Sequence, residues 1–338
     1  MFKSLKQNIK QRPTKFLVLI LALIIPVLFF TRQKENTNQT TNKTLLPPPD
    51  ISINSSITTP KRSISNLNQS LPNYAPITPL QPTNSKIIEI QVYSIAEEMN
   101  FNQSPTIKQA DANPYYKWDS DRGYFYANQS TGQFDIKIIQ NKSTSSIIGE
   151  SDGKQLALNW LNKNLPKSSF LLEKTSYLKS QVVELVPTNS TQSADYYQFE
   201  FSPTINNTPI VDVNQETSLI KITVSKNGYI FSVNHPLPLS IYQTAATNQP
   251  EYPLKTLTQI NQEIGLNLPI ITLLDDETNE LISSKTSIKN AKYSHIDLAY
   301  QLSSDQNHLV PVFKLTGTAQ LENGLVVSIT AYLSAIDQ

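Results

Sequence analysis

The sequence predicts an α+β protein: an N-terminal transmembrane helix, a disordered tether, and then antiparallel-sheet modules, each with one packed helix. Three observations lead to this prediction. A long apolar run near the N-terminus is followed by a polar tract without glycine. Further along, short segments alternate apolar and polar residues as strands do, and two segments space apolar residues as amphipathic helices do.

The apolar run occupies residues 16–30, and we expect a membrane helix over residues 16–31. Fifteen helical residues cover about 23 Å, and the stems of Lys15 and Arg32 extend the span toward the ~30 Å of a bilayer core. A cleaved signal peptide is the main alternative, but bulky and charged residues stand where small ones are needed for cleavage. A buried core helix is the other alternative, and the polar tract that follows offers it nothing to pack against.

Charge gives the orientation of this segment. Basic residues precede it without any acidic residue among them: Lys3, Lys6, Lys10, Arg12 and Lys15. The positive-inside rule places residues 1–15 in the cytoplasm and the bulk of the chain outside the cell membrane. The lipid bilayer is therefore expected to contact the chain through residues 16–31.

Composition excludes several classes of function. The 338-residue chain has no cysteine, which excludes disulfides, thiolate nucleophiles and cysteine-ligated metal sites. Its net charge is +1, so no long-range field recruits nucleic acid. Abundant Asn, Ile, Lys and Ser with few glycines suggest a bacterial source. We expect no cofactor.

Residues 32–85 are expected to be a disordered tether rich in Asn, Thr, Ser and Pro, because their scattered apolar residues show no period. Residues 86–147 are expected to form a β-rich subdomain. Ile88, Ile90 and Val92 alternate with polar residues and predict a first strand. Residues 124–126 and 134–139 then predict a hairpin with a five-residue loop.

Two α+β modules are expected at residues 148–245 and 246–338. The first begins with a helix at residues 151–165, with Ser151 as N-cap and an apolar stripe that includes Trp160. The second begins with a helix at residues 253–264, with Ile260 in its stripe. Strands are expected to follow these helices, at residues 177–186, 196–201, 219–225, 229–233, 270–274, 295–302, 309–315 and 325–333.

Aromatic residues are dense before and within the predicted hairpin, and they are the speculative partner-binding residues: Tyr115, Tyr116, Trp118, Tyr124 and Tyr126. Exposed aromatic rings stack on sugars or grip peptides, whereas buried ones pack across strands. Cross-strand packing is the simpler interpretation. Because Tyr124 and Tyr126 alternate with Phe125, the three rings cannot all lie in one core.

The remaining chemical signals are weak. Residues 149–153 read Gly-Glu-Ser-Asp-Gly, but no parallel βα series surrounds Ser151 as a serine hydrolase requires. The three histidines lack metal-ligand spacing. Asp119 and Asp121 resemble the start of a calcium loop whose later ligands are missing. We therefore expect no catalytic and no metal-binding residue.

Residues 219–233 read Leu-Ile-Lys-Ile-Thr-Val-Ser-Lys-Asn-Gly-Tyr-Ile-Phe-Ser-Val, which resembles the strand–turn–strand of PepSY-type domains. The order of one membrane helix followed by tandem α+β modules is similar to that of the YycH/YycI-type extracytoplasmic regulators. The resemblance covers about residues 150–338. The resemblance implies a non-enzymatic module that binds a membrane or secreted protein. The tether and the region 86–147 depart from that pattern.

These expectations combine into a single-pass, membrane-anchored extracytoplasmic regulatory protein that acts by protein–protein contact and is not an enzyme. The alternative is a cell-envelope glycan-binding module that uses the aromatic hairpin at residues 115–134. A third hypothesis, a hydrolase at Ser151, predicts labelling by a fluorophosphonate probe.

Overall fold

The computed structural model describes residues 62–64, 70–81, 84–110, 113–139, 147–165, 169–181, 184–211, 220–242, 249–264, 270–275, 280–281 and 288–337. These residues fall in one compact unit that spans residues 47–338. No helix within the described ranges is long and apolar enough to cross a membrane. The predicted membrane helix at residues 16–31 lies outside them.

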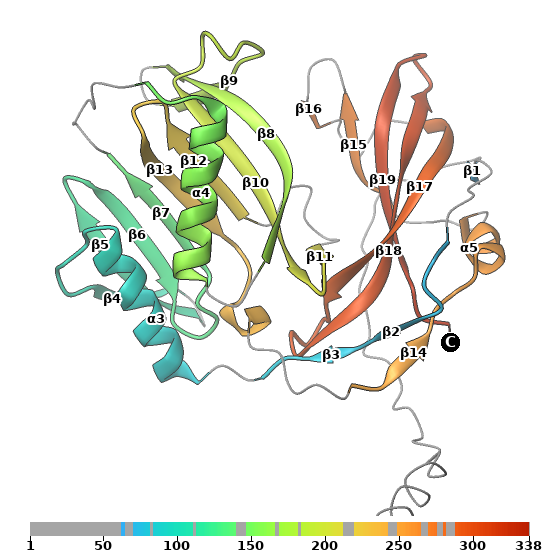
Figure 1. Cartoon of the computed structure of the whole chain (residues 1–338), viewed down its shortest axis with the longest axis horizontal. Helices are drawn as coiled ribbons and strands as arrows, with labels where there is room; N and C mark the ends of the chain where they lie inside the picture. The colour runs from blue at the N-terminus through green and yellow to red at the C-terminus, as the bar shows by residue number, and fades with distance from the viewer. Residues whose placement is uncertain are drawn as a thin grey trace, which may run out of the picture. The chain divides into compact units, whose positions relative to one another are not determined.

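Strands dominate the described chain, and the predicted α+β class is confirmed (Figure 1). The helices are α3 (Ser85–Glu98), α4 (Glu150–Asn164) and α5 (Leu257–Ile264), with a short 3₁₀ turn at Leu239–Tyr242. The strands are β1 (Arg62–Ile64), β2 (Tyr74–Pro76), β3 (Thr78–Pro79), β4 (Thr106–Ala110), β5 (Asn113–Ser120), β6 (Gly123–Asn128), β7 (Phe134–Ile138), β8 (Ser169–Gln181), β9 (Glu184–Pro187), β10 (Tyr196–Ile205), β11 (Thr208–Val211), β12 (Ile220–Ser225), β13 (Tyr229–His235), β14 (Glu251–Pro253), β15 (Ile270–Asp275), β16 (Glu280–Leu281), β17 (Ile288–Leu302), β18 (His308–Leu321) and β19 (Val326–Ser334).

Antiparallel pairs join part of the strands in the order β4–β5–β6–β7–β13–β12–β10–β8–β9, which we call the first sheet. Helices α3 and α4 lie over one face of it (Figure 1). Alternate residues of β6 and β7, such as Phe125 and Ile136, point to these helices and are fully buried. The predicted hairpin is confirmed, because β6 and β7 pair across the loop at residues 129–133.

The strand predicted at residues 88–92 is wrong, because this segment belongs to helix α3. Ile88, Val92 and Ile95 recur at helical spacing and are buried against the sheet, whereas Ile90 is 63% exposed. The Asn84 side chain accepts a hydrogen bond from the backbone N–H of Lys86 and caps the helix. A helix also leaves the apolar stripe continuous on the side that meets the sheet.

Helix α4 follows the prediction closely, with Ala157, Trp160 and Leu161 buried on one face. Its N-cap is Gly149 rather than Ser151, which lies in the first helical turn. Gly153 allows the close approach of this helix to the sheet. A Cβ atom there would lie 3.1 Å from the ring of Tyr197 on β10.

Two side-chain contacts join α3 to α4. The Gln91 amide donates to the carbonyl oxygen of Asn164, and Lys163 forms an ion pair of 2.9 Å with Glu98. A buried contact joins the two helices as well: the indole N–H of Trp160 on α4 lies 3.2 Å from the sulfur of Met99, which follows the last residue of α3. The two helices therefore cover the sheet as one layer.

A second set of antiparallel strands runs in the order β16–β15–β19–β18–β17, which we call the second sheet. Strand β11 links the two sheets, because it pairs with β10 in a hairpin and parallel to β17. Gly317 on β18 faces an irregular step in β17, where a Cβ atom would lie 2.1 Å from the carbonyl oxygen of Lys292. Glycine is required there because any other side chain would collide with the neighbouring backbone.

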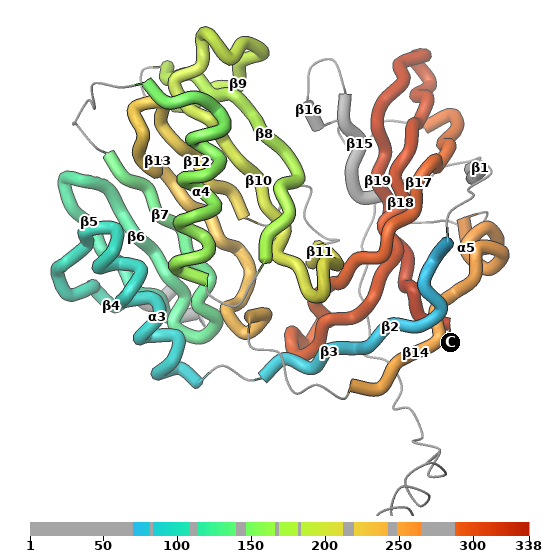
Figure 2. Tube along the Cα trace, in the orientation of Figure 1, coloured from blue at the N-terminus to red at the C-terminus, as the bar shows by residue number. Residues whose placement is uncertain are grey.

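The predicted tether was expected to reach residue 85, but ordered structure begins earlier. Strand β2 pairs with β14, and β3 pairs with the start of β18. Figure 2 shows β2 and β14 side by side, although they are far apart in the sequence. Ala75, Ile77 and Leu80 are buried in these pairings. These isolated apolar residues gave no periodic signal, because β2 and β3 have only three and two residues. Their pairing partners lie much later in the chain.

Helix α5 also begins later than predicted, because Pro253 and Leu254 belong to an extended segment. Pro253 ends β14, and Leu254 forms a bridge with Ile336 near the end of the chain. The helix begins after Thr256, where Thr256 and Gln259 form a capping box: the Gln259 amide oxygen accepts from the Thr256 N–H at 2.7 Å.

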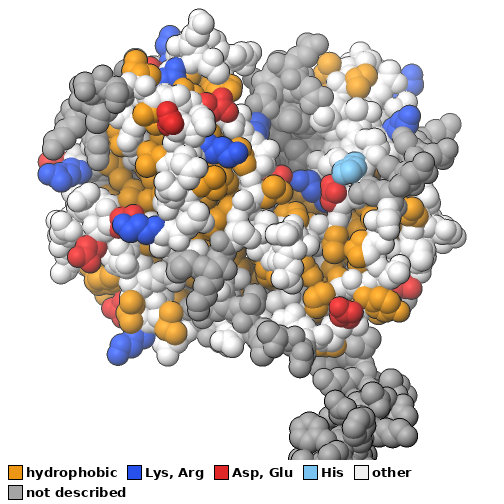
Figure 3. Space-filling model, viewed as in Figure 1, with side chains coloured by type: hydrophobic (Ala, Val, Ile, Leu, Met, Phe, Trp, Pro, Cys, Tyr) orange, Lys and Arg blue, Asp and Glu red, His pale blue; other side chains and the backbone are white. Residues whose placement is uncertain are grey.

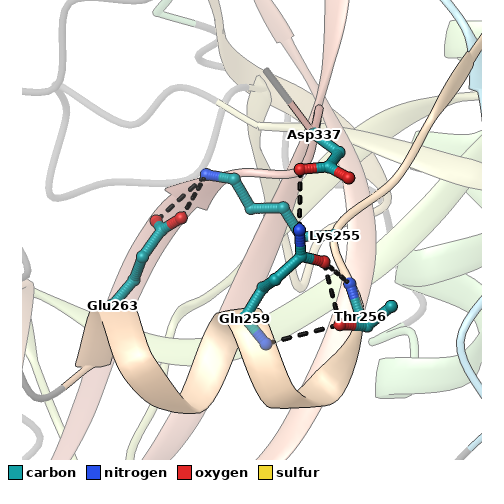
Figure 4. A network of polar contacts seen from close by, with 5 residues as sticks. All are labelled: Lys255, Thr256, Gln259, Glu263 and Asp337. Atoms are coloured by element: carbon teal, nitrogen blue, oxygen red, sulfur yellow. Dashed lines mark hydrogen bonds and ion pairs between the residues drawn. The ribbon is translucent and has the colours of Figure 1, made fainter.

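The same glutamine ties α5 to the C-terminal segment (Figure 4). Its side-chain nitrogen donates to a carboxylate oxygen of Asp337 at 2.7 Å. Backbone hydrogen bonds run beside this contact, from Lys255 to Ala335 and from Asp337 to Pro253. Lys255 also forms an ion pair of 2.8 Å with Glu263, which lies one helical turn after Gln259. Gln259 thus joins a helix cap to the last described residue.

Replacing Gln259 with Ala should destabilise the protein by about 1–2 kcal/mol, because the capping box and the contact to Asp337 are lost together. Gln262→Ala on the exposed side of α5 is the matched control and should change stability by less than about 0.5 kcal/mol. Urea unfolding followed by circular dichroism measures both variants. Equal stability of the two would show that the network in Figure 4 contributes nothing.

Candidate functional site

The candidate site lies on the face of the first sheet that is opposite α3 and α4, which we call the open face. Strand alternation decides which aromatic residues reach it. Tyr115, Tyr124 and Tyr126 are half-buried and point to the open face. Tyr116 and Trp118 point the other way and lie in the core, where the ring of Trp118 stacks on Phe125 at 4.9 Å.

The five aromatic residues predicted as one binding group are therefore divided between two faces. Tyr93 on α3 covers Tyr116 and Trp118, with ring centroids at 5.6 and 5.4 Å. The indole N–H of Trp118 donates to the backbone oxygen of Gln103. Tyr116 and Trp118 thus hold α3 on the sheet and cannot touch a ligand bound to the open face.

The three tyrosines of the open face form a connected group. Ring centroids are 4.9 Å apart for Tyr124 and Tyr126 and 5.9 Å apart for Tyr115 and Tyr126. The ammonium group of Lys117 lies 5.4 Å from the centroid of the Tyr126 ring and 2.6 Å from a carboxylate oxygen of Asp119. Hydrogen bonds from Lys117 to Asp119 and Tyr126 raise the pKa of the ammonium group.

Asp135 completes this group from β7. It lies opposite Tyr126 across the β6–β7 pair and opposite Asn234 across the β7–β13 pair. Burial, together with the charge of Asp135 and a hydrogen bond to it, raises the pKa of Tyr124 to about 12. The hydroxyl of Tyr124 therefore stays protonated at physiological pH. A tyrosine ring, an amide and a carboxylate thus stand side by side on three adjacent strands.

A cavity of about 350 Å³ lies at this point of the open face. Its lining includes Tyr115 and Tyr126 together with Gln133, Asp135 and Asn234. Two aromatic rings with carboxylate and amide groups at the rim fit a small polar ring or one side chain of a bound peptide.

On β10 and β12 the open face carries polar residues that are buried. Glu200 on β10 and Thr223 on β12 are only 8% and 2% exposed. On the same face, Tyr196 on β10 and Phe231 on β13 have ring centroids 4.8 Å apart, and burial raises the pKa of Tyr196 to about 12. The cavity lies at the part of the open face formed by β5, β6, β7 and the end of β13.

Sequence reasoning missed Asp135, Asn234 and Lys117. The signal was present for two of them, because Asp135 alternates with Phe134 and Ile136, and Lys117 alternates with Tyr116 and Trp118. Alternation thus assigns Lys117 to the face of Tyr115, and Asp135 to the face opposite Phe134. Asn234 reaches the site only through the pairing of β13 with β7, which no local pattern indicates.

The other chemical candidates lie apart from one another. Ser151 is exposed in the first turn of α4, and Asp119 is paired with Lys117. His295 lies 3.1 Å from Asp297, and His308 lies 3.8 Å from Asp305. In the part of the chain that the structure describes, no group of three or more His, Asp or Glu side chains could hold a metal ion. Most of the acidic run at residues 275–280 falls outside the described residues.

His235 lies under the site, on the side of the helices. Its ring is fully buried, stacks on Phe134 at 4.8 Å, and has its Nε2 atom 2.7 Å from the hydroxyl of Tyr242. Burial lowers the pKa of His235 to about 4. The neutral imidazole thus ties the end of β13 to the 3₁₀ turn.

No model of a known protein family matches the chain, and no curated protein matches its sequence. Among solved structures, the chain is similar to an uncharacterized protein from Eubacterium rectale ATCC 33656, with 14% sequence identity and a TM-score of 0.49. That similarity covers 84% of this chain and 90% of the other. A TM-score and an identity of this size support no conclusion about function.

His235 should make the protein less stable in mild acid. In the unfolded chain the imidazole takes up a proton near its ordinary pKa of 6.5, whereas in the folded chain it does so only near 4. The unfolded state binds more protons in this window. Stability should therefore fall as pH drops from 6.5 to 4, by about 3 kcal/mol from this residue.

Unfolding free energies of wild type, His235→Gln and His295→Gln between pH 4 and 7 check this expectation. His235→Gln should be less stable at neutral pH and should lose less stability on acidification than wild type. His295→Gln removes an imidazole whose side chain is 55% exposed and serves as the control for the substitution. A wild-type slope in the His235 variant would contradict the assignment.

Proposed function

We propose that the chain is a single-pass, membrane-anchored extracytoplasmic regulatory protein that binds a membrane or secreted protein and catalyses no reaction. Residues 16–31 are its membrane helix in this proposal, and the polar residues after them are its tether. The finer architecture belongs to the proposal as well: one α+β module at residues 148–245 with α4 and another at residues 246–338 with α5, as in PepSY-type and YycH/YycI-type proteins. Composition, charge and the order of the elements support it.

One observation carries the proposal, namely the tyrosine group on the open face. Tyrosine is enriched at protein interfaces because it offers a large rigid ring and a polar hydroxyl at little cost in conformational entropy. Tyr115, Tyr124 and Tyr126 are held by ring contacts and by Lys117 and Asp135, so they are ordered before a partner arrives. Ordered anchors reduce the entropy lost on binding.

The cavity beside these rings favours a second candidate, a module that binds cell-envelope glycans. Its two tyrosines supply faces on which a sugar ring can stack, and Asp135, Asn234 and Gln133 supply acceptors and donors for hydroxyl groups. A protein partner remains our first proposal because the group extends beyond the cavity to Tyr124 and Lys117.

Replacing Tyr124 and Tyr126 together with Ala should reduce capture of a protein partner about tenfold or more, as expected when interface anchors are removed. The full chain is expressed in native membranes, crosslinked and purified with the proteins attached to it. Tyr74→Ala, at a tyrosine that is 59% exposed on β2, is the control and should capture the partner normally. Circular dichroism of each variant verifies folding.

The same variants separate the two candidates. If the tyrosine variant loses retention on envelope polysaccharide while its protein captures are unchanged, the glycan module is correct and the regulatory proposal fails. If wild type and variant recover the same proteins in equal amounts and neither is retained on polysaccharide, the open face has no binding role. The protein used must retain residues 70–80, because β2 and β3 are part of the fold.

A further inference from the structure

Helix α3 is apolar on two sides. One side meets the sheet through Ile88, Val92 and Ile95, as described above. Another side also carries large apolar residues: Ile87 and Ile90 are 47% and 63% exposed, and Tyr93 is 40% exposed beside its ring contacts with Tyr116 and Trp118. They recur every three residues and so form one line along the helix. A helix that only covers a sheet needs a polar outer side.

The edge strand beside α3 extends this apolar surface. Ile107 on β4 is 63% exposed and lies opposite Tyr116, whose ring contacts Tyr93. In the described chain β4 pairs only with β5. Figure 3 shows hydrophobic side chains at the surface where Figure 1 draws α3. We call Ile87, Ile90, Tyr93 and Ile107 the α3 patch.

Two opposite charges stand at the two ends of the α3 patch. Lys86 and Glu97 are both exposed, and their spacing of three helical turns puts them on the same side as Ile90 and Tyr93. No ion pair joins either of them to another described residue. The midpoint between Lys86 and Glu97 along the helix is also the midpoint between Ile90 and Tyr93.

This arrangement is self-complementary. If two copies of α3 lie antiparallel about a two-fold axis at that midpoint, Lys86 of each copy faces Glu97 of the other, and Ile90 of each faces Tyr93 of the other. Isologous contacts of this kind are the commonest basis of homodimers. In the opposite, parallel arrangement, like charges would meet and nothing would pair the isoleucine with the tyrosine.

We propose that the α3 patch binds the α3 patch of a second copy of this chain, with the two helices antiparallel. The contacts of α3 with α4, through Gln91 and Glu98, hold the helix in place and leave its outer side free. This surface lies on the helix side of the sheet, whereas the candidate site lies on the open face. A dimer therefore leaves the candidate site accessible.

Sedimentation of the full chain in detergent, over a series of concentrations, tests the proposal. Wild type should form a dimer, and Ile90→Glu should weaken it at least tenfold because it buries a charge in the centre of the contact. Ile139→Glu replaces an isoleucine that is 51% exposed after β7 and should dimerise as wild type does. A monomeric wild type, or equal effects of the two variants, would overturn the proposal.

A charge exchange gives a result that does not depend on misfolding. Lys86→Glu alone and Glu97→Lys alone should each weaken the dimer several-fold, because each places like charges opposite one another. The double variant, with both changes in one chain, should recover most of the wild-type affinity. If the double variant dimerises no better than the single ones, the antiparallel pairing is wrong.

Discussion

The packing of α3 and α4 on one face of the first sheet is the constraint on which the other features depend. Each strand alternates its side chains, so covering one face with helices fixes which residues remain on the other. Phe125 and Ile136 lie under the helices, and Tyr126 and Asp135 consequently occupy the open face. Gly153 makes this layer close-fitting, because it brings α4 within contact of the ring of Tyr197.

The same layer explains why the molecule offers two different surfaces. The open face carries tyrosines whose hydroxyls have polar partners, which suits a polar or mixed ligand. The outer side of α3 carries exposed isoleucines between Lys86 and Glu97, which suits another apolar surface. One sheet thus places the candidate site and the proposed dimer surface on opposite sides, so occupation of either would leave the other unobstructed.

Local sequence patterns predicted the elements whose partners are near in the chain. The hairpin of β6 and β7 and the buried stripe of α4 follow from alternation and helical spacing. Helix α3 was missed because Ile88, Ile90 and Val92 satisfy the period of a strand, although Ile88 and Val92 alone also fit that of a helix. Three residues cannot distinguish the two periods, whereas Ile95 and the Asn84 cap could have done so.

The candidate site was predictable only in part, for a related reason. Density of aromatic residues located the region, and alternation within β5 would have separated Tyr116 and Trp118 from Tyr115. Asn234 could not be found, because it joins the site through β13, which follows β7 in space but not in sequence. Pairing between strands that are distant in the sequence cannot be recognised in a short stretch of residues. Sites formed by such pairing are therefore found only in the folded structure.

Strands β2 and β3 have a consequence for the order in which the chain matures. Both emerge early in synthesis, yet β2 pairs with residues 251–253 and β3 with residues 308–309. The bridge from Leu254 to Ile336 adds the last segment to the same place. Strands β2 and β3 must therefore wait until these later residues have been synthesised before they acquire partners, and such distant closures are slow. Termination shortly before Ile336 would leave both pairings possible but would remove the bridge that covers Leu254 next to β14.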